Sequence, residues 1–344
     1  MNQPTHAWLA VEAFRTIQRC STTEAGKQRK LDRLVALLDQ NLHDVVVAAW
    51  LPDLLIKDMT FGHVFKTSAY QGDQVARFTL SRNDLKTHLA PSAFQCESFL
   101  DRLPAEWWAA PYKVKDDGGH LPARVADLCQ SARDMLKMGD NELYALCGVK
   151  APAGHGEIAS DLLYSARDVA VMMWMASHYI ADGHMPFHCD NRNLASTSSD
   201  KNAHSKIEDL WGEQVPALFK ASTVLSRPSD EILAAPLPTQ SNFKGIGFET
   251  DIPPLKNGGD PWKEAVYICR ASFALSFGLV PPTVAAVDDQ TKQVSREDIL
   301  ANNGYCGEER FWNISRAIMH DAAASIAMFW QDVWWDFVKG GGAN

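Results

Sequence analysis

Two pairs of residues with metal-binding side chains stand four positions apart in this chain. His178 and Asp182 form the first pair, and His204 and Glu208 form the second. Residues at i and i+4 share one face of a helix, so each pair can offer an imidazole nitrogen and a carboxylate oxygen to one ion. These donors suit zinc. A single such pair is more often an ordinary helix ion pair, but two of them close together predict a metal centre.

The segment between the pairs can bring a third histidine to the same place. Gly183 and Pro186 interrupt the helix, so the chain turns and His188 approaches from another direction. Clusters of histidine and carboxylate residues mark metal sites. With three upstream residues added, the predicted metal ligands are His6, Asp53, His63, His178, Asp182, His188, His204 and Glu208.

The three upstream candidates have simpler interpretations as well. Asp53 follows Pro52 at the end of a predicted helix, where an aspartate can be a turn or cap residue. His63 lies in the loop that follows. His6 lies at a predicted helix start, and a histidine near a terminus is often only solvated.

The run HYIADGHMPFH, residues 178–188, resembles the H-x-x-x-D-x-[HN]-x-P-x-H motif of the zinc-dependent phospholipases C and the related single-strand nucleases of fungi and plants. Pro52-Asp53 and His63 match the part of the pattern that precedes the motif. His204-x-x-x-Glu208 matches the part that follows it, where the nucleases have aspartate. Thr5-His6 and GHLPARV at 119–125 are similar to bacterial members. The resemblance covers residue 6 to about residue 210, and residues 212–344 match only in being helical.

The resemblance implies a cluster of two to three zinc ions. The ligands of the first zinc would be Asp53, His63, His178 and Asp182. The ligands of the second would be His188, His204 and Glu208. A third would share Asp182 with the first and use His6. Asp53 would also be the catalytic residue, orienting or deprotonating the nucleophile.

The implied activity is zinc-dependent hydrolysis of a phosphodiester. Glu208 favours phospholipase C cleavage of a phospholipid to diacylglycerol and a phosphorylated head group. The alternative is a single-strand nuclease or 3′-nucleotidase using the same zinc cluster. A non-catalytic, metal-stabilised scaffold is an alternative of another class. The choline pocket of the family has an aromatic residue after the aspartate, and this chain has Leu54 there.

The composition of the chain limits the classes of binding partner that we expect. The chain has 344 residues and a formal net charge of −9. Proteins that grip nucleic acid through many phosphates usually have a basic surplus, so we expect no stable nucleic-acid complex. We expect a phospholipid or other phosphodiester as the substrate, transient contact with a membrane surface, and a monomer. No signal peptide is visible at the start of the sequence, which favours a cytoplasmic protein or one exported without a leader.

Apolar residues recur at three- and four-residue intervals along most of the chain, which predicts an all-α fold. We expect a single helical domain over 1–344 with long loops. The expected helices are 7–20, 26–50, 122–137, about 157–182, 204–221, 261–277 and 307–338. Residues 74–80 are a weak strand candidate, and the expected loops are 66–75, 109–121, 189–203 and 226–260.

Several other residues could be taken for functional groups, but we expect them to have structural roles. His43-Asp44 is expected to be a pair on a helix surface, and Cys189 a buried thiol. His184, inside the motif, is expected to hydrogen-bond near the ligands without binding metal. The tryptophans, including Trp330, Trp334 and Trp335, are assigned mostly to core packing.

Overall fold

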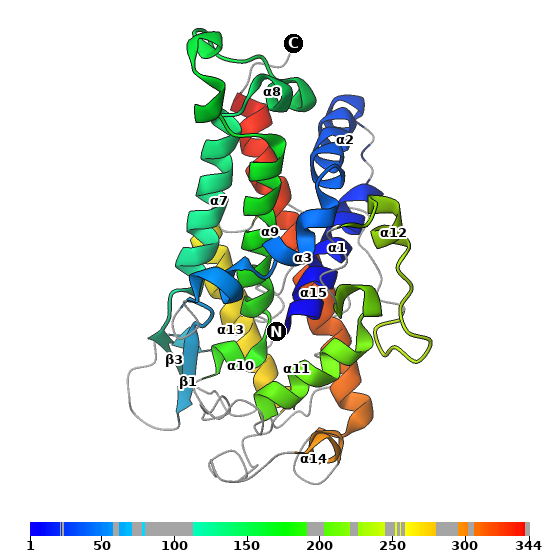
Figure 1. Cartoon of the computed structure of the whole chain (residues 1–344). Coiled ribbons are helices and arrows are strands. Elements are labelled where there is room, and N and C mark those ends of the chain that lie inside the picture. The colour runs from blue at the N-terminus through cyan, green and yellow to red at the C-terminus, as the bar shows by residue number, and fades with distance from the viewer. Residues whose placement is uncertain are drawn as a thin grey trace.

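Helices account for most of the chain in the computed structural model, which confirms the predicted fold class (Figure 1). The structure describes residues 1–20, 22, 24–57, 62–70, 78–79, 113–190, 203–220, 226–244, 252, 255, 259–279, 295–301 and 306–340. The α-helices are α1 (Gln3–Arg19), α2 (Ala25–Asp39), α3 (Val45–Ala48), α7 (Leu121–Lys137), α8 (Asn141–Cys147), α9 (Ala166–Gly183), α10 (Pro186–Cys189), α11 (Ala203–Gln214), α12 (Ser229–Ala234), α13 (Pro261–Leu279), α14 (Arg296–Leu300) and α15 (Glu308–Gly340).

Short helical turns connect these helices. The 3-10 turns are η1 (Leu42–Asp44), η3 (His155–Glu157), η4 (Ser160–Leu162) and η5 (Ala217–Lys220), and η2 (Pro52–Ile56) is a π-helical turn. Among the described residues, no single helix is long and apolar enough to cross a membrane; only the bent pair Ala25–Asp39 with Leu42–Ile56 passes that test, by length and composition.

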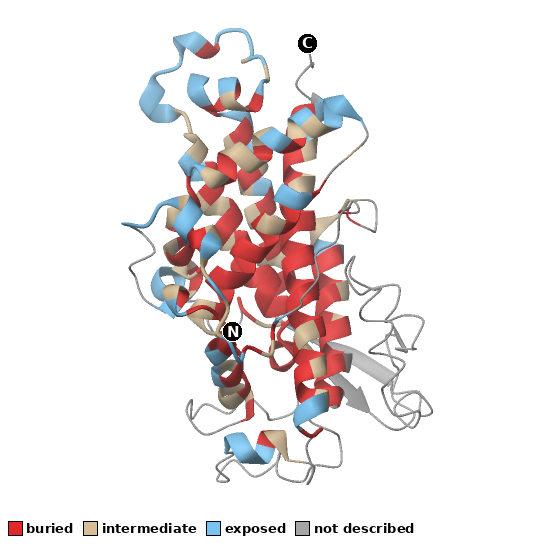
Figure 2. Cartoon of the chain, turned by 90° about the vertical axis from the view of Figure 1, so that its right-hand side faces the viewer, coloured by how far each residue is buried: buried red, intermediate tan, exposed pale blue. Residues whose placement is uncertain are grey.

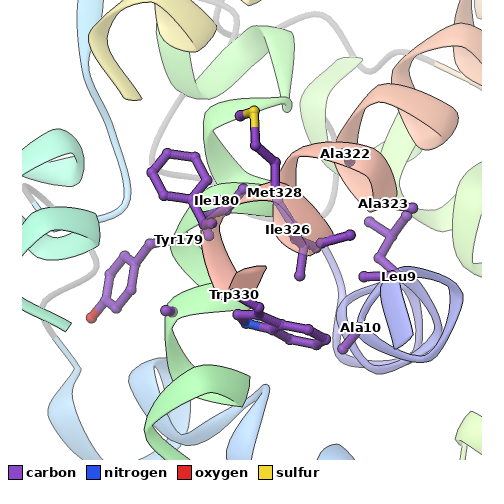
Figure 3. Close-up of a cluster of buried hydrophobic side chains, with 14 of the residues drawn as sticks. Leu9, Ala10, Tyr179, Ile180, Ala322, Ala323, Ile326, Met328 and Trp330 are labelled. Carbon is purple, nitrogen blue, oxygen red and sulfur yellow. The ribbon is translucent and has the colours of Figure 1, made fainter. Parts of the chain in front are cut away.

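The long helices α7, α9 and α15 run side by side, and α1 and α13 pack against this group (Figure 1). Buried residues line the interior along the whole length of the bundle (Figure 2). Leu9 of α1, Ile180 of α9 and both Ile326 and Trp330 of α15 meet in its middle (Figure 3). Trp330 and Trp334 are buried, as predicted. Nε1 of Trp330 donates to the Met173 carbonyl of α9, the helix that carries Asp182, and Nε1 of Trp334 donates to the Lys30 carbonyl of α2.

Three of the expected helices differ in their bounds by more than five residues. The helix predicted over 204–221 ends at Gln214, and the separate 3-10 turn η5 follows it. The helix predicted over 26–50 ends at Asp39, because the side-chain amide of Asn41 donates to the Leu37 carbonyl and the chain then turns. The helix predicted from about 157 begins at Ala166, after two 3-10 turns. Ser165 and Asp168 form a reciprocal capping box at this start, which satisfies amide groups that a continuing helix would have paired.

A small antiparallel sheet lies beside the helices, with strand order β1-β3-β2. Its strands are β1 (Lys66–Tyr70), β2 (Phe78–Thr79) and β3 (Lys113–Gly118). β2 falls inside the weak strand candidate, whereas β1 and β3 lie in segments predicted to be loops. The polar run KVKDDG has no alternating pattern, and its pairing with residues 66–70 is a long-range contact that local sequence does not reveal.

Candidate metal centre

The last two turns of α9 carry His178 and Asp182 into the interior of the protein. Their side chains are 0% and 1% exposed. Nδ1 of His178 lies 2.7 Å from the backbone carbonyl of Ala49. Because a carbonyl can only accept, Nδ1 must donate this hydrogen bond, and Nε2 is left with a lone pair. Nε2 lies 3.0 Å from Nδ1 of His63 and 3.2 Å from Oδ2 of Asp182, so it faces the cluster.

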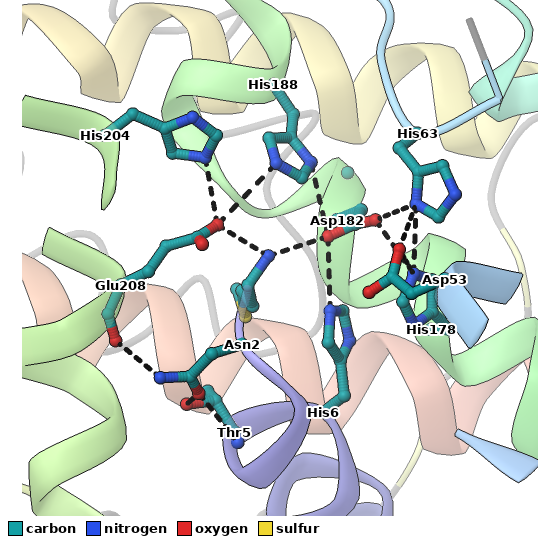
Figure 4. Close-up of polar contacts among 12 residues, drawn as sticks. Asn2, Thr5, His6, Asp53, His63, His178, Asp182, His188, His204 and Glu208 are labelled. Atoms are coloured by element: carbon teal, nitrogen blue, oxygen red, sulfur yellow. Dashed lines mark hydrogen bonds and ion pairs between the residues drawn. The ribbon is translucent and has the colours of Figure 1, made fainter. Parts of the chain in front are cut away.

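The two carboxylate oxygens of Asp182 face two different sets of histidines (Figure 4). Oδ2 lies 2.8 Å from Nδ1 of His63 and 3.2 Å from Nε2 of His178. Oδ1 lies 3.2 Å from Nδ1 of His188 and 3.4 Å from Nε2 of His6. One side chain therefore joins both halves of the cluster.

Asp53 completes the first half from the π-helical turn η2. Its Oδ1 lies 3.6 Å from Nδ1 of His63 and 3.6 Å from Nε2 of His178. The Asp53 side chain is 16% exposed, so water reaches it while Asp182 is sealed. With His63 and His178 it forms a group whose ligand atoms converge closely enough to hold one ion.

The second half is built on α10 and α11. His204 and Glu208 stand one helical turn apart on α11, and Nε2 of His204 lies 2.9 Å from Oε1 of Glu208. Nε2 of His188 lies 3.7 Å from the same oxygen. The side chains are 11% exposed for His188, 18% for His204 and 20% for Glu208, so this half opens toward solvent.

The amino group of Met1 lies between the two halves. Its nitrogen is 3.0 Å from Oδ1 of Asp182 and 2.8 Å from Oε1 of Glu208. Burial lowers the pKa of this amine, but the two carboxylates outweigh burial and raise it to about 11. The position between Asp182 and Glu208 therefore favours positive charge.

Two buried histidines offer nitrogens without hydrogen bonds. Neither ring nitrogen of His6 makes a hydrogen bond, and Nδ1 of His188 makes none either. Both rings nevertheless lie close to Asp182. Burial lowers the pKa of His6 to about 3 and that of His188 to about 4, so both are neutral at pH 7. Buried polar atoms are nearly always satisfied, and neutral imidazoles with free lone pairs are metal ligands. These residues therefore fit a metal ion.

The carboxylates remain charged. Burial raises the pKa of both Asp182 and Glu208, yet the Met1 ammonium beside them opposes burial and holds each pKa well below its usual value. At neutral pH the anionic oxygens of Asp182 and Glu208 thus lie beside the neutral imidazole nitrogens of His6 and His188, and oxygen and imidazole donors together suit zinc.

Lys66 holds the loop of His63 against the helix of His188. Its Nζ donates to the carbonyl of Phe187 at 2.6 Å and to that of Asp190 at 3.0 Å, and the Phe65 amide donates to the carbonyl of His188 at 3.2 Å. Carbonyls at a helix end have no partner within the helix, so Lys66 supplies one from outside it.

Gly119 lets the same loop pack against the start of α7. A Cβ atom there would lie 2.0 Å from the Val64 carbonyl oxygen, and its φ is +143°. Only glycine fits such a backbone approach. The Leu121 amide then donates to the Val64 carbonyl at 3.3 Å.

Asn2 links α1 to α11. Its side-chain oxygen caps α1 by accepting from the Thr5 amide, while Nδ2 donates to the Glu208 carbonyl at 3.0 Å. Gly212 makes room for this contact, because a Cβ there would lie 2.1 Å from Nδ2 of Asn2. The link fixes His6 and Glu208 relative to one another.

The remaining candidates have other partners. His184 is buried and lies 2.9 Å from the hydroxyl of Ser325 on α15, so it anchors the turn after Asp182. Cys189 is buried, as predicted. Asp44 is buried and pairs with Arg167 at 2.7 Å, so the expectation of a surface pair is wrong for Asp44.

All eight residues singled out in the sequence lie in this one cluster. The groups whose ligand atoms converge are His6 with His178 and Asp182; Asp53 with His63 and His178; and His188 with His204 and Glu208. The residues that hold them in place were not singled out. Those residues are Asn2, Ala49, Lys66 and Ser325, and each acts through a contact distant in sequence.

Comparison with known proteins gives one structural likeness. No protein-family model matches the chain, and no curated protein matches it. Among solved structures, the alpha-toxin of Clostridium perfringens from an avian strain is similar, with a TM-score of 0.49 and 13% sequence identity. The match covers 99% of this chain and 65% of the alpha-toxin chain.

Proposed function

We propose that this chain is a zinc-dependent phosphodiester hydrolase that cleaves a phospholipid as a phospholipase C does. The observation that carries the proposal is Asp182, whose two oxygens face separate sets of imidazoles at 2.8 to 3.4 Å. A carboxylate placed in this way suits a bridge between two cations, and paired cations suit displacement at phosphorus.

Each proposed zinc position has its own donors. The first would use Asp53, His63, His178 and Asp182, and the second His188, His204 and Glu208. His6 and the other oxygen of Asp182 would contribute to a third, at the place that the Met1 ammonium occupies. When bound, zinc would supply positive charge that neutralises a phosphodiester and would lower the pKa of water.

The chain's own groups would then position the reactants. Asp53 is the carboxylate of the first half that solvent reaches, so it is the group suited to accept a proton from an attacking water. Asp182 stays ionised and sealed, and therefore holds charge without exchanging protons. Nδ1 of His178 is committed to Ala49, which keeps its ring in one orientation.

Partial exposure supports catalysis over a purely structural metal site. A structural zinc is closed by four protein ligands, whereas a catalytic zinc keeps an open position. Asp53, His204 and Glu208 are 16%, 18% and 20% exposed, so a substrate can approach from their side.

The proposal is tested by metal analysis and hydrolysis on one preparation. We expect bound zinc, and zinc-dependent cleavage of both bis(p-nitrophenyl) phosphate and phosphatidylcholine that a chelator abolishes. Full activity in excess chelator would refute the zinc mechanism. Cleavage of single-stranded DNA without cleavage of phosphatidylcholine would assign the same centre to a nuclease.

A further inference from the structure

Three consecutive apolar side chains next to Asp53 are exposed to solvent. Leu54, Leu55 and Ile56 are 42%, 70% and 45% exposed. We refer to these three residues as the apolar rim. Exposed apolar side chains that occur singly need no explanation, but contiguous ones mark an interaction surface.

The backbone of the rim is held in a closed turn. The Leu54 amide donates to the Trp50 carbonyl at 3.0 Å, and the Lys57 amide donates to the Pro52 carbonyl at 2.8 Å. Lys57 then ends the turn with φ at +54°, in the left-handed region. The rim is therefore presented by a hydrogen-bonded turn that also carries Asp53.

Among the residues that the structure describes, the other large exposed apolar side chains do not adjoin the candidate metal centre in sequence. Leu162 is 65% exposed and precedes α9, whereas Asp182 lies in the last turn of that 18-residue helix. A helix of this length separates its ends by about 25 Å. Leu162 thus matches Leu55 in type and exposure but precedes the first turn of α9, at the opposite end of that helix from Asp182.

We propose that the apolar rim inserts into the acyl region of a zwitterionic phospholipid bilayer and thereby brings a head-group phosphodiester to Asp53. This inference rests on the proposed hydrolase function. In a bilayer the phosphodiester lies directly above the acyl chains, so a protein that reaches it in place needs an apolar surface beside its reactive groups. A groove for single-stranded nucleic acid would instead use aromatic and basic side chains, and the rim has neither.

The net charge of the protein indicates which kind of bilayer the apolar rim would bind. The chain has a formal net charge of −9, which repels an anionic surface, and the rim is followed by one exposed cation, Lys57. Apolar insertion rather than electrostatic attraction is therefore the source of affinity, and phosphatidylcholine vesicles are the appropriate probe.

The test compares Leu55→Ser with Leu162→Ser in the full chain loaded with zinc. Partition onto phosphatidylcholine vesicles is measured by sedimentation, and hydrolysis is measured on vesicle lipid and on soluble bis(p-nitrophenyl) phosphate. Leu55→Ser is expected to lower the vesicle partition coefficient by about tenfold, because one leucine side chain no longer inserts into the bilayer. The rate on vesicle lipid, divided by the rate on the soluble diester, should fall by the same factor. Leu162→Ser is expected to change neither quantity by more than about twofold.

Several outcomes would overturn the inference. They are an unchanged partition and rate ratio for Leu55→Ser, an equal loss for Leu162→Ser, or tight binding only to phosphatidylserine vesicles that salt abolishes. A dimer of the unsubstituted chain that Leu55→Ser converts to monomer would assign the rim to a second copy. Failure of the hydrolase proposal is separate: the soluble diester would not be cleaved, while vesicle binding would still depend on Leu55.

Discussion

The two halves of the candidate metal centre are held in different ways. His6 and His178 lie on the long helices α1 and α9, their rings stack at 3.9 Å, and both side chains are fully buried. His188 and His204 lie on the shorter helices α10 and α11, and their side chains are 11% and 18% exposed. The core therefore fixes His6 and His178 before any ion binds, whereas the positions of His188 and His204 depend more on the ion itself. Asp182 belongs to both halves.

Asp182→Asn should have the largest effect, because it removes the carboxylate that the first and third zinc positions would share. We expect the rate of diester hydrolysis to fall at least about a hundredfold and the zinc content to fall with it. Zinc stoichiometry by mass spectrometry and kcat on bis(p-nitrophenyl) phosphate provide the check. A variant with full zinc content and rate would show that Asp182 does not join the first and third zinc positions.

His178→Ala and His204→Ala should separate the halves by stability. In chelator, His178→Ala should lower the free energy of unfolding by about 2–3 kcal/mol, because it opens a buried space and leaves the Ala49 carbonyl without its donor. His204→Ala should cost less than about 1 kcal/mol, since the ring is partly exposed. Urea unfolding measures both values, and equal losses would contradict the division into a core-fixed and an ion-dependent half.

The zinc-free protein should lose stability as the pH falls from about 6.5 toward 4. The folded-state pKa values of His6 and His188 are about 3 and about 4, below the ordinary value of 6.5. In this window the unfolded chain binds more protons, so stability rises with pH by at most about 1.4 kcal/mol per unit for each imidazole. Thermal unfolding at pH 4.5, 5.5 and 6.5 in chelator tests this slope, and a flat profile would count against burial of neutral imidazoles.

Lys66→Met should have a smaller effect, confined to metal affinity. Removing the ammonium leaves the carbonyls of Phe187 and Asp190 without their donor and loosens His188. We expect zinc affinity, measured by competition with a chromophoric chelator, to fall about tenfold. Lys66→Arg keeps the charge and should recover part of the loss. No change in Lys66→Met would show that the loop of His63 is positioned without it.

The sequence predicted the long helices and the ligand candidates for a common reason. Amphipathic periodicity over many residues marks α1, α7, α13 and α15, and i, i+4 pairs mark ligands on a helix face. The late start of α9 had a local signal that was overlooked, since Ser165 and Asp168 have the spacing of a capping box.

Other features have no local signal. Strand β3 forms by pairing with residues distant in sequence, and its own residues are polar. Lys66, Asn2 and Ala49 position the ligands through backbone contacts, in which the identity of the partner residue plays little part. Such contacts follow only from the assembled fold.

An anomalous difference map at the zinc absorption edge, from crystals of the zinc-loaded protein, tests the central claim most directly. The account predicts separate peaks on the two sides of Asp182, one near Asp53, His63 and His178 and one near His188, His204 and Glu208. Ligand distances should be about 2.0–2.2 Å. A map without peaks in this cluster, from crystals shown by fluorescence to contain zinc, would contradict it.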